Sequence, residues 1–299
     1  MTAPFHVTID CDSLASHHAV WGLPPPDAGD VEAFFLRGLE VADAWLSERN
    51  LPATFFLTAE RLTTPVLDRL VRLAAAGHEV GNHTWSHPYD LARLPPDAVR
   101  AELSRNHRRL AEAGLLCRGF RAPGYHLSPG ALAAVEALGY AYSSSQITGW
   151  VYPAAKWAAT LGLGLRGRET RTVRHPVSDW WTPPAPYHPA PTAPHRPGSS
   201  PVWELPIAAG RWGLPTVGSL IHTGVPPFLF DTPDTRPWIM NLHLTDFTPD
   251  APRLALAGPD FTLRRPLERR LLALDRILAR ARARGRDVRT LLDLAASLG

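Results

Sequence analysis

Two histidines four residues apart are the first residues in this sequence whose spacing suggests chemistry. They lie in the segment GNHTWSHP, at His83 and His87. On a helix this spacing would place both imidazoles on one face, where they could share a metal ion. Gly81 and Pro88 flank the pair, however, and both residue types are poor helix formers. We therefore expect the histidines on a turn after a short strand at residues 78–83, and a metal there would need a third ligand from elsewhere.

Other polar residues follow other expected strands. The segment TIDCD ends in Asp10 and Asp12, RAPGY contains Arg121, and NLHLTD contains His243 and Asp246. Strand ends are where α/β folds keep their chemistry. A carboxylate from the DCD segment could complete a site of two histidines and one carboxylate, with a position left open for water, as in catalytic zinc sites.

The elements that must position these residues alternate between strand and helix. We expect strands at residues 5–9, 53–58, 78–83, 117–123 and 140–144, with helices at 30–50, 65–77, 95–114 and 128–139 between them. Two more strands are expected at 202–209 and 237–246, then an arginine-rich helix from 269, then a last short strand and helix from 286. This repetition implies a parallel sheet or barrel. We assign residues 1–299 to one catalytic domain with an irregular Pro-rich insert at 145–200.

Composition limits the class of protein. The chain has 299 residues, 45% of them hydrophobic, and a formal net charge of +3, which indicates a globular chain with a sizeable core. Its C-terminal arginines recur with leucines at helical spacing, so we place them on the solvated face of a helix and expect no nucleic-acid partner. Cys11 and Cys117 are expected to be buried free thiols. We find no signal peptide and no transmembrane segment, and therefore predict a cytoplasmic location. The oligomeric state is left open.

Five short segments carry a resemblance to a known family. TIDCD, HTWSHP, RAPGY, DWW and LHLTD occur in the order of the five motifs of the polysaccharide deacetylases, carbohydrate esterase family four, over residues 5–295. HTWSHP is the most specific. In TIDCD the usual adjacent aspartates are separated by Cys11, which resembles the D-x-D version of cytoplasmic-type members, among them deacetylases, deformylases and ring-amide hydrolases. In RAPGY the order also differs, because the aromatic residue usually precedes the glycine.

The resemblance implies a fold and a metal site. The fold would be a distorted (β/α) barrel of about seven strands. Asp12, His83 and His87 would hold one divalent ion, with zinc as our first choice and cobalt, manganese or iron as alternatives.

The resemblance also implies the catalytic groups. Asp10 would be the general base that takes a proton from the attacking water, and Arg121 would pair with Asp10 and keep it ionised. A backbone N–H of Gly124 or Tyr125 would stabilise the oxyanion.

The acid and its support come from the last two motifs. His243 would protonate the leaving amine, and Asp179 would orient its imidazole. Asp246 is a rival for that supporting role, and His222 is a rival acid. His17, close after the DCD segment, we assign to the surface.

We therefore expect a metal-dependent hydrolase of an amide C–N bond, which most simply removes an N-acetyl group from a small or lipid-linked amino sugar. A deformylase or a hydrolase of small or cyclic amides on the same scaffold is the alternative enzyme. An inactive carbohydrate-binding relative is the alternative of another class. A phosphotransferase of the haloacid-dehalogenase type also begins with D-x-D, but it needs a lysine, and the single Lys156 lies in the irregular insert.

Overall fold

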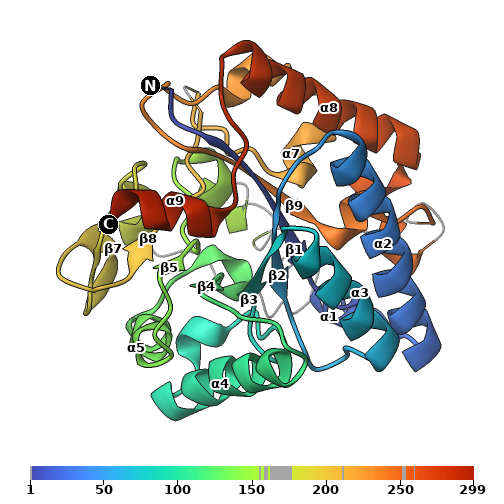
Figure 1. Cartoon of the computed structure of the whole chain (residues 1–299), viewed down its shortest axis with the longest axis horizontal. Coiled ribbons are helices and arrows are strands. Elements are labelled where there is room, and N and C mark those ends of the chain that lie inside the picture. Colours follow the sequence, from blue (N-terminus) through green and yellow to red (C-terminus); the bar gives the residue numbers. More distant parts are fainter. Residues whose placement is uncertain are drawn as a thin grey trace.

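Seven parallel strands form one curled sheet at the centre of the molecule (Figure 1). The structure is a computed structural model that describes residues 2–154, 156–157, 161, 177–210, 212–250, 254–258 and 260–299. The strand order is β8-β5-β4-β3-β2-β1-β9. The strands are β1 (Phe5–Cys11), β2 (Thr54–Leu57), β3 (Glu79–Asn82), β4 (Gly119–Phe120), β5 (Tyr142–Ser143), β8 (Trp203–Glu204) and β9 (Trp238–His243). The sheet confirms the predicted α/β fold, a distorted barrel of seven strands.

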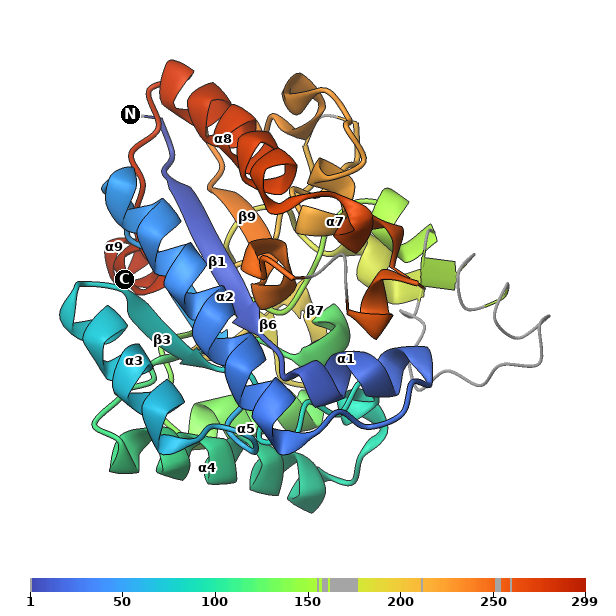
Figure 2. The same cartoon turned by 90° about the vertical axis from the view of Figure 1, so that its right-hand side faces the viewer.

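Helices surround this sheet. Those described are α1 (Leu14–Trp21), α2 (Ala28–Glu48), α3 (Thr64–Ala75), α4 (Pro96–Glu112), α5 (Pro129–Ala137), α7 (Gly218–Ile221), α8 (Leu267–Ala283) and α9 (Leu291–Leu298). Figure 1 shows α2, α3, α4, α5 and α8 arranged around the outside of the strands. Figure 2 shows β1 and β9 side by side, between α2 and α8. A small antiparallel hairpin, β6 (Pro189–Ala190) and β7 (Ala193–Pro197), lies apart from the main sheet.

Side-chain alternation along β1 separates two apolar layers. Phe5, Val7, Ile9 and Cys11 belong to the core that packs against the surrounding helices. The barrel interior has its own apolar cluster, which includes Phe56, Tyr142 and Ile239 together with Leu291 and Leu294 of α9. Helix α9 therefore packs against the interior of the curled sheet.

Most of the expected elements are confirmed, with local differences. Helix α1 was not predicted, and the next helix begins at Ala28 behind the N-cap residue Asp27, not at Asp30. The strand expected after residue 286 is reduced to a single parallel bridge between Phe5 and Val288. Within the predicted 145–200 insert, residues 155, 158–160 and 162–176 lie outside the described residues. The one-domain assignment therefore stays a prediction.

Three further expectations concern single residues. Cys11 and Cys117 are free and buried, as predicted. The arginines of α8 do not all face solvent: Arg270 is fully buried, and its guanidinium donates to the carbonyls of Thr245 and Thr248. None of the helices in the described ranges has an apolar stretch long enough to cross a membrane.

Gly81 of β3 is required by packing inside the barrel. A Cβ on this residue would lie 2.6 Å from the Phe56 ring. That ring in turn lies beneath the Arg121 guanidinium, 4.2 Å from its central carbon. We expect Gly81→Ala to lower the free energy of unfolding by about 1–3 kcal/mol, because an added methyl overpacks a filled interior. Denaturant unfolding curves measure this.

The matched control is Gly29→Ala, since nothing lies within 4 Å of a Cβ at that position of α2. It should leave stability unchanged or slightly raised, because alanine favours a helix. Equal stability of the two variants would contradict the packing argument.

Candidate metal centre and active site

The turn after β3 explains the spacing of His83 and His87. Thr84 and His87 both have left-handed backbone conformations, with φ of 69° and 58°, so the segment is a tight turn and not a helix. The Asn82 side chain accepts the Thr84 N–H at 2.9 Å, and the Thr84 hydroxyl accepts the His87 N–H at 3.2 Å. These bonds turn both imidazoles inward, where their ring centroids lie 4.8 Å apart.

Asp12, at the end of the first strand, completes a three-residue cluster. Its Oδ1 lies 3.2 Å from Nε2 of His83 and 3.2 Å from Nε2 of His87. All three side chains are buried. In a tetrahedral zinc site with bonds of about 2.0 to 2.1 Å, neighbouring ligand atoms lie roughly 3.3 Å apart. The spacing of these three atoms suits a metal ion between them.

The hydrogen bonds around the cluster support the same interpretation. Nδ1 of His83 donates to the Arg121 carbonyl at 2.7 Å, which turns the lone pair of Nε2 toward Asp12. Oδ1 of Asp12 is buried and has no hydrogen-bond partner. A carboxylate oxygen and two imidazole nitrogens therefore converge on one point, an arrangement that suits a bound cation. The residues present fit a divalent metal.

The electrostatics of His87 and Asp12 agree with this fit, whereas for His83 burial lowers the pKa but the hydrogen bond to Asp12 outweighs it and raises that pKa. Burial lowers the pKa of His87 to about 3, so this imidazole is neutral near pH 7, as a ligand must be. Burial raises the pKa of Asp12, but the neighbouring His87 and His83 outweigh it and hold that pKa well below its usual range. Asp12 is therefore a carboxylate, ready to bind a cation.

Asp10 lies two residues earlier on β1 and, through strand alternation, points to the same side as Asp12. Its Oδ1 accepts a hydrogen bond from Nη1 of Arg121 at 2.7 Å, and both side chains are fully buried. Burial raises the pKa of Asp10, but the charge of Arg121 outweighs it, with help from His83 and His243, and lowers that pKa. The predicted Asp10–Arg121 pair is present.

His243 closes the site from the last strand, β9. Its Nε2 lies 4.0 Å from Oδ2 of Asp10 and 3.9 Å from Oδ2 of Asp12. Its side chain is 31% exposed, so it can reach a substrate. The structure thus brings the predicted base, the predicted acid and the three predicted ligands to one edge of the sheet.

Part of the chain matches a known family. Residues 39–143 match the family model of the polysaccharide deacetylases. The matched segment contains both cluster histidines and Arg121, while Asp10, Asp12 and His243 lie outside it.

Two of the curated proteins that match part of the chain are deacetylases. A chitooligosaccharide deacetylase of Bradyrhizobium is 41% identical over 81 residues, which are 26% of this chain and 36% of that protein. A peptidoglycan-N-acetylglucosamine deacetylase of Bacillus cereus is 35% identical over 79 residues, 26% of this chain and 28% of that protein. The chain spans about a third of the length of the first curated relatives it matches.

A solved structure supports the fold over the whole chain. A Mycobacterium smegmatis protein assigned as a polysaccharide deacetylase has 18% sequence identity and a TM-score of 0.53, covering 97% of this chain and 94% of that one. The curled seven-stranded sheet therefore shares the fold of that protein.

The fourth deacetylase motif needs a correction. The resemblance assigned Asp179 to the His243 imidazole, but the structure pairs it with a different histidine: Oδ2 of Asp179 lies 2.5 Å from Nδ1 of His126. Asp246 contacts His243 through the backbone, where its Oδ2 accepts the His243 N–H at 2.7 Å. Its other oxygen binds Nε2 of His222 at 2.7 Å, so the rival acid is already occupied. Asp246 can reach the His243 N–H because it lies in the 3₁₀ turn directly after β9.

The third motif also differs from the expectation. The N–H of Tyr125 donates to the Ala122 carbonyl at 3.1 Å within a 3₁₀ turn, so it is not available for an oxyanion. The proposed role of the Gly124 N–H stays a prediction. What enters the site is the Tyr125 side chain, whose hydroxyl lies 2.9 Å from Oδ2 of Asp10.

The sequence analysis did not include several residues that line the candidate site. Asn241, Thr8 and Ser144 all bind the Arg121 guanidinium. Two of them could have been predicted from strand alternation. Asn241 lies two residues before His243, and Thr8 lies two residues before Asp10, so each shares a strand face with a site residue. His17, predicted at the surface, places its ring centroid 6.2 Å from that of His243.

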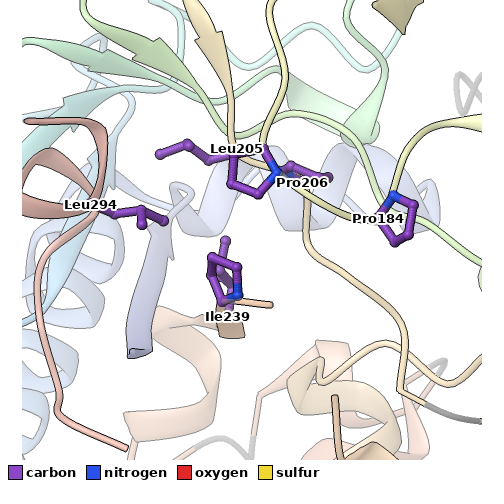
Figure 3. A pocket seen from close by; sticks show the side chains of 7 residues that line it. Pro184, Leu205, Pro206, Ile239 and Leu294 are labelled. Atoms are coloured by element: carbon purple, nitrogen blue, oxygen red, sulfur yellow. The ribbon is translucent and has the colours of Figure 1, made fainter. Parts of the chain in front are cut away.

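An apolar hollow elsewhere in the molecule does not belong to this site. It is too narrow to hold a water molecule and is lined by Pro184, Leu205, Pro206, Ile239 and Leu294 among others (Figure 3). It lies between the chain after β8 and the start of β9, the two edge strands of the sheet. Its lining has no titratable side chain, so it offers packing space and no chemistry.

Proposed function

We propose that this chain is a metal-dependent amide hydrolase that removes an N-acetyl group from an amino sugar or a sugar conjugate. The observation that carries the proposal is the cluster of Asp12, His83 and His87, with Nε2 of His243 3.9 Å from Asp12 and 4.0 Å from Asp10. The names of the deacetylase relatives support the substrate class.

The chain's own residues divide the work of hydrolysis. Asp12, His83 and His87 would hold a divalent ion, which would supply Lewis-acid activation of a water molecule and of the amide carbonyl. Asp10, kept ionised by Arg121, accepts a proton at Oδ2 from the attacking water. His243 gives a proton from Nε2 to the amine nitrogen as the C–N bond breaks. Asp246 fixes the backbone of His243 and so holds the acid at the strand end.

We propose zinc as the native ion, with cobalt, manganese or iron as alternatives, since one carboxylate and two imidazoles suit all four. The free or lipid-linked nature of the amino sugar and the cytoplasmic location stay predictions from the sequence.

Elemental analysis tests the metal site directly. We expect about one equivalent of a divalent transition metal in the wild type and a loss of at least tenfold in His83→Ala/His87→Ala, because a single carboxylate cannot hold the ion. The surface variant His188→Ala is the control, since His188 stacks on Trp203 outside the cluster. Metal content that survives the double substitution would contradict the assigned ligands.

The same preparations test the reaction. Wild type loaded with metal should release acetate from N-acetylated amino sugars, and the double variant should not. Release of formate alone, from N-formylated analogues, would favour the deformylase alternative. Metal binding with no hydrolysis of any acetyl, formyl or cyclic amide would favour the inactive carbohydrate-binding relative.

A further inference from the structure

Tyr125 holds an unusual place in this site. It follows Gly124, and the two residues have consecutive left-handed conformations, with φ of 72° and 59°. A left-handed backbone is strained for a tyrosine and persists where the surroundings enforce it. The two left-handed residues turn the 125 side chain inward, and the side chain is 7% exposed.

The Tyr125 hydroxyl touches three polar groups. Its oxygen lies 2.9 Å from Oδ2 of Asp10, 3.2 Å from Nε2 of His243 and 2.7 Å from Nδ2 of Asn241. The base and the acid of the proposed reaction are themselves 4.0 Å apart. The phenol oxygen is therefore a shorter link between them than their direct contact.

The orientation of Asn241 fixes the direction of these bonds. Oδ1 of Asn241 accepts from Nη1 of Arg121 at 2.5 Å and from the Thr8 hydroxyl at 3.1 Å, so its Nδ2 is the end that donates to the phenol oxygen. Burial and the nearby Asp10 raise the pKa of Tyr125 well above its ordinary value, so the hydroxyl keeps its proton. With one lone pair occupied by Asn241, the hydroxyl can donate to Asp10 and accept from a protonated His243.

We propose that the Tyr125 hydroxyl is a positioning residue that holds the Asp10 carboxylate and the His243 imidazole in one hydrogen-bonded line. This inference rests on the proposed amide hydrolase function. Oδ2 of Asp246 accepts the His243 N–H, and the backbone of Asp246 contacts the His243 side chain in the capping box of the turn. The phenol holds the Nε2 end of the imidazole, and through Asp10 it also sets where the base points its second oxygen.

The test compares Tyr125→Phe with Tyr187→Phe. Each variant removes one buried hydroxyl that makes a hydrogen bond, but the Tyr187 hydroxyl binds the Pro194 carbonyl, in the β6–β7 hairpin. We expect Tyr125→Phe to lower kcat about 10- to 100-fold, because small errors in the placement of catalytic groups are costly, with KM within about twofold. Tyr187→Phe should keep the wild-type kcat. A kcat of Tyr125→Phe within twofold of wild type would overturn the proposal.

A second readout does not depend on turnover. In metal-free protein, the ¹⁵N resonance of His243 Nε2, assigned by its absence in His243→Gln, should shift in Tyr125→Phe and stay in place in Tyr187→Phe. A resonance that does not move in Tyr125→Phe would overturn the proposal, whatever the activity. If the wild type hydrolyses no amide but the resonance shifts, the hydroxyl link is supported and the proposed function fails.

Discussion

Asp10→Asn is expected to lower kcat/KM for amide hydrolysis by about 10²- to 10⁴-fold while the protein keeps its metal. Asparagine has nearly the shape of aspartate, and its Oδ1 can still accept from Arg121 Nη1, which lies 2.7 Å from Oδ1 of Asp10. It cannot accept a proton at neutral pH, so the attacking water loses its base. The three ligand side chains are other residues, so elemental analysis should find wild-type metal content. Steady-state kinetics on an N-acetylated amino sugar measure the loss.

The matched control is Asp43→Asn, which removes a carboxylate paired with Arg69 at 2.9 Å away from the site. Its kcat/KM should equal that of the wild type. Activity of Asp10→Asn within tenfold of the wild type would remove Asp10 as the general base. Loss of metal together with activity would instead make Asp10 a ligand.

Arg121→Met is expected to destabilise the fold by about 3–5 kcal/mol. The guanidinium is fully buried and donates to Asp10 and Thr8 on β1, to Asn241 on β9 and to Ser144 after β5. Methionine of similar length fills the space but leaves the Asp10 carboxylate buried without its counter-charge. Denaturant unfolding curves of metal-free protein measure the change without a contribution from metal binding.

A double variant tests whether the charge is the cause. Arg121→Met/Asp10→Asn should lose less stability than the two single changes added together, because no unpaired charge is left inside. The control Arg100→Met breaks a pair with Asp97 whose side chains are 66% and 89% exposed, and should cost about 0–1 kcal/mol. A cost of Arg121→Met no larger than that of the control would contradict the role of Arg121 as counter-charge.

The fold was largely predictable because its periodic signals are local. The run 53–58 is apolar enough for a strand buried on both faces, and β2 (Thr54–Leu57) is buried throughout. Ser128 followed by Pro129 predicts the start of α5, and the Ser128 hydroxyl accepts the Ala131 N–H at 3.2 Å. Helix α1 was missed because its apolar residues do not recur on one face. The start of α2 was predicted two residues late, because the Asp27 side chain at its N-cap makes no capping hydrogen bond that would mark the position.

The site was predictable where residue type and strand end coincide. Asp12 and His83 follow strands directly, so parallel pairing brings them together, and the tight turn after β3 adds His87. Asp179 was not predictable in this way, because it comes from a 3₁₀ segment in the irregular region, where no register with β9 exists. For a similar reason the sequence analysis considered the backbone N–H of Tyr125 and did not predict that its side chain enters the site. Its direction depends on two left-handed residues in sequence, which the letters GY do not reveal.

The two faces of strand β1 have different roles, one in core packing and one in the candidate site. Phe5, Val7, Ile9 and Cys11 build the helix-facing core, while Thr8 and Asp10 face the barrel interior, and Asp12 follows on their side. A substitution on the outer face, such as another small apolar residue at Cys11, alters only packing. Insertion or deletion of one residue within the strand would exchange the faces, and carboxylates would enter the apolar layer while aliphatic groups filled the metal centre. In this strand, gene variants that change length should be eliminated more strictly than variants that change the identity of a single residue.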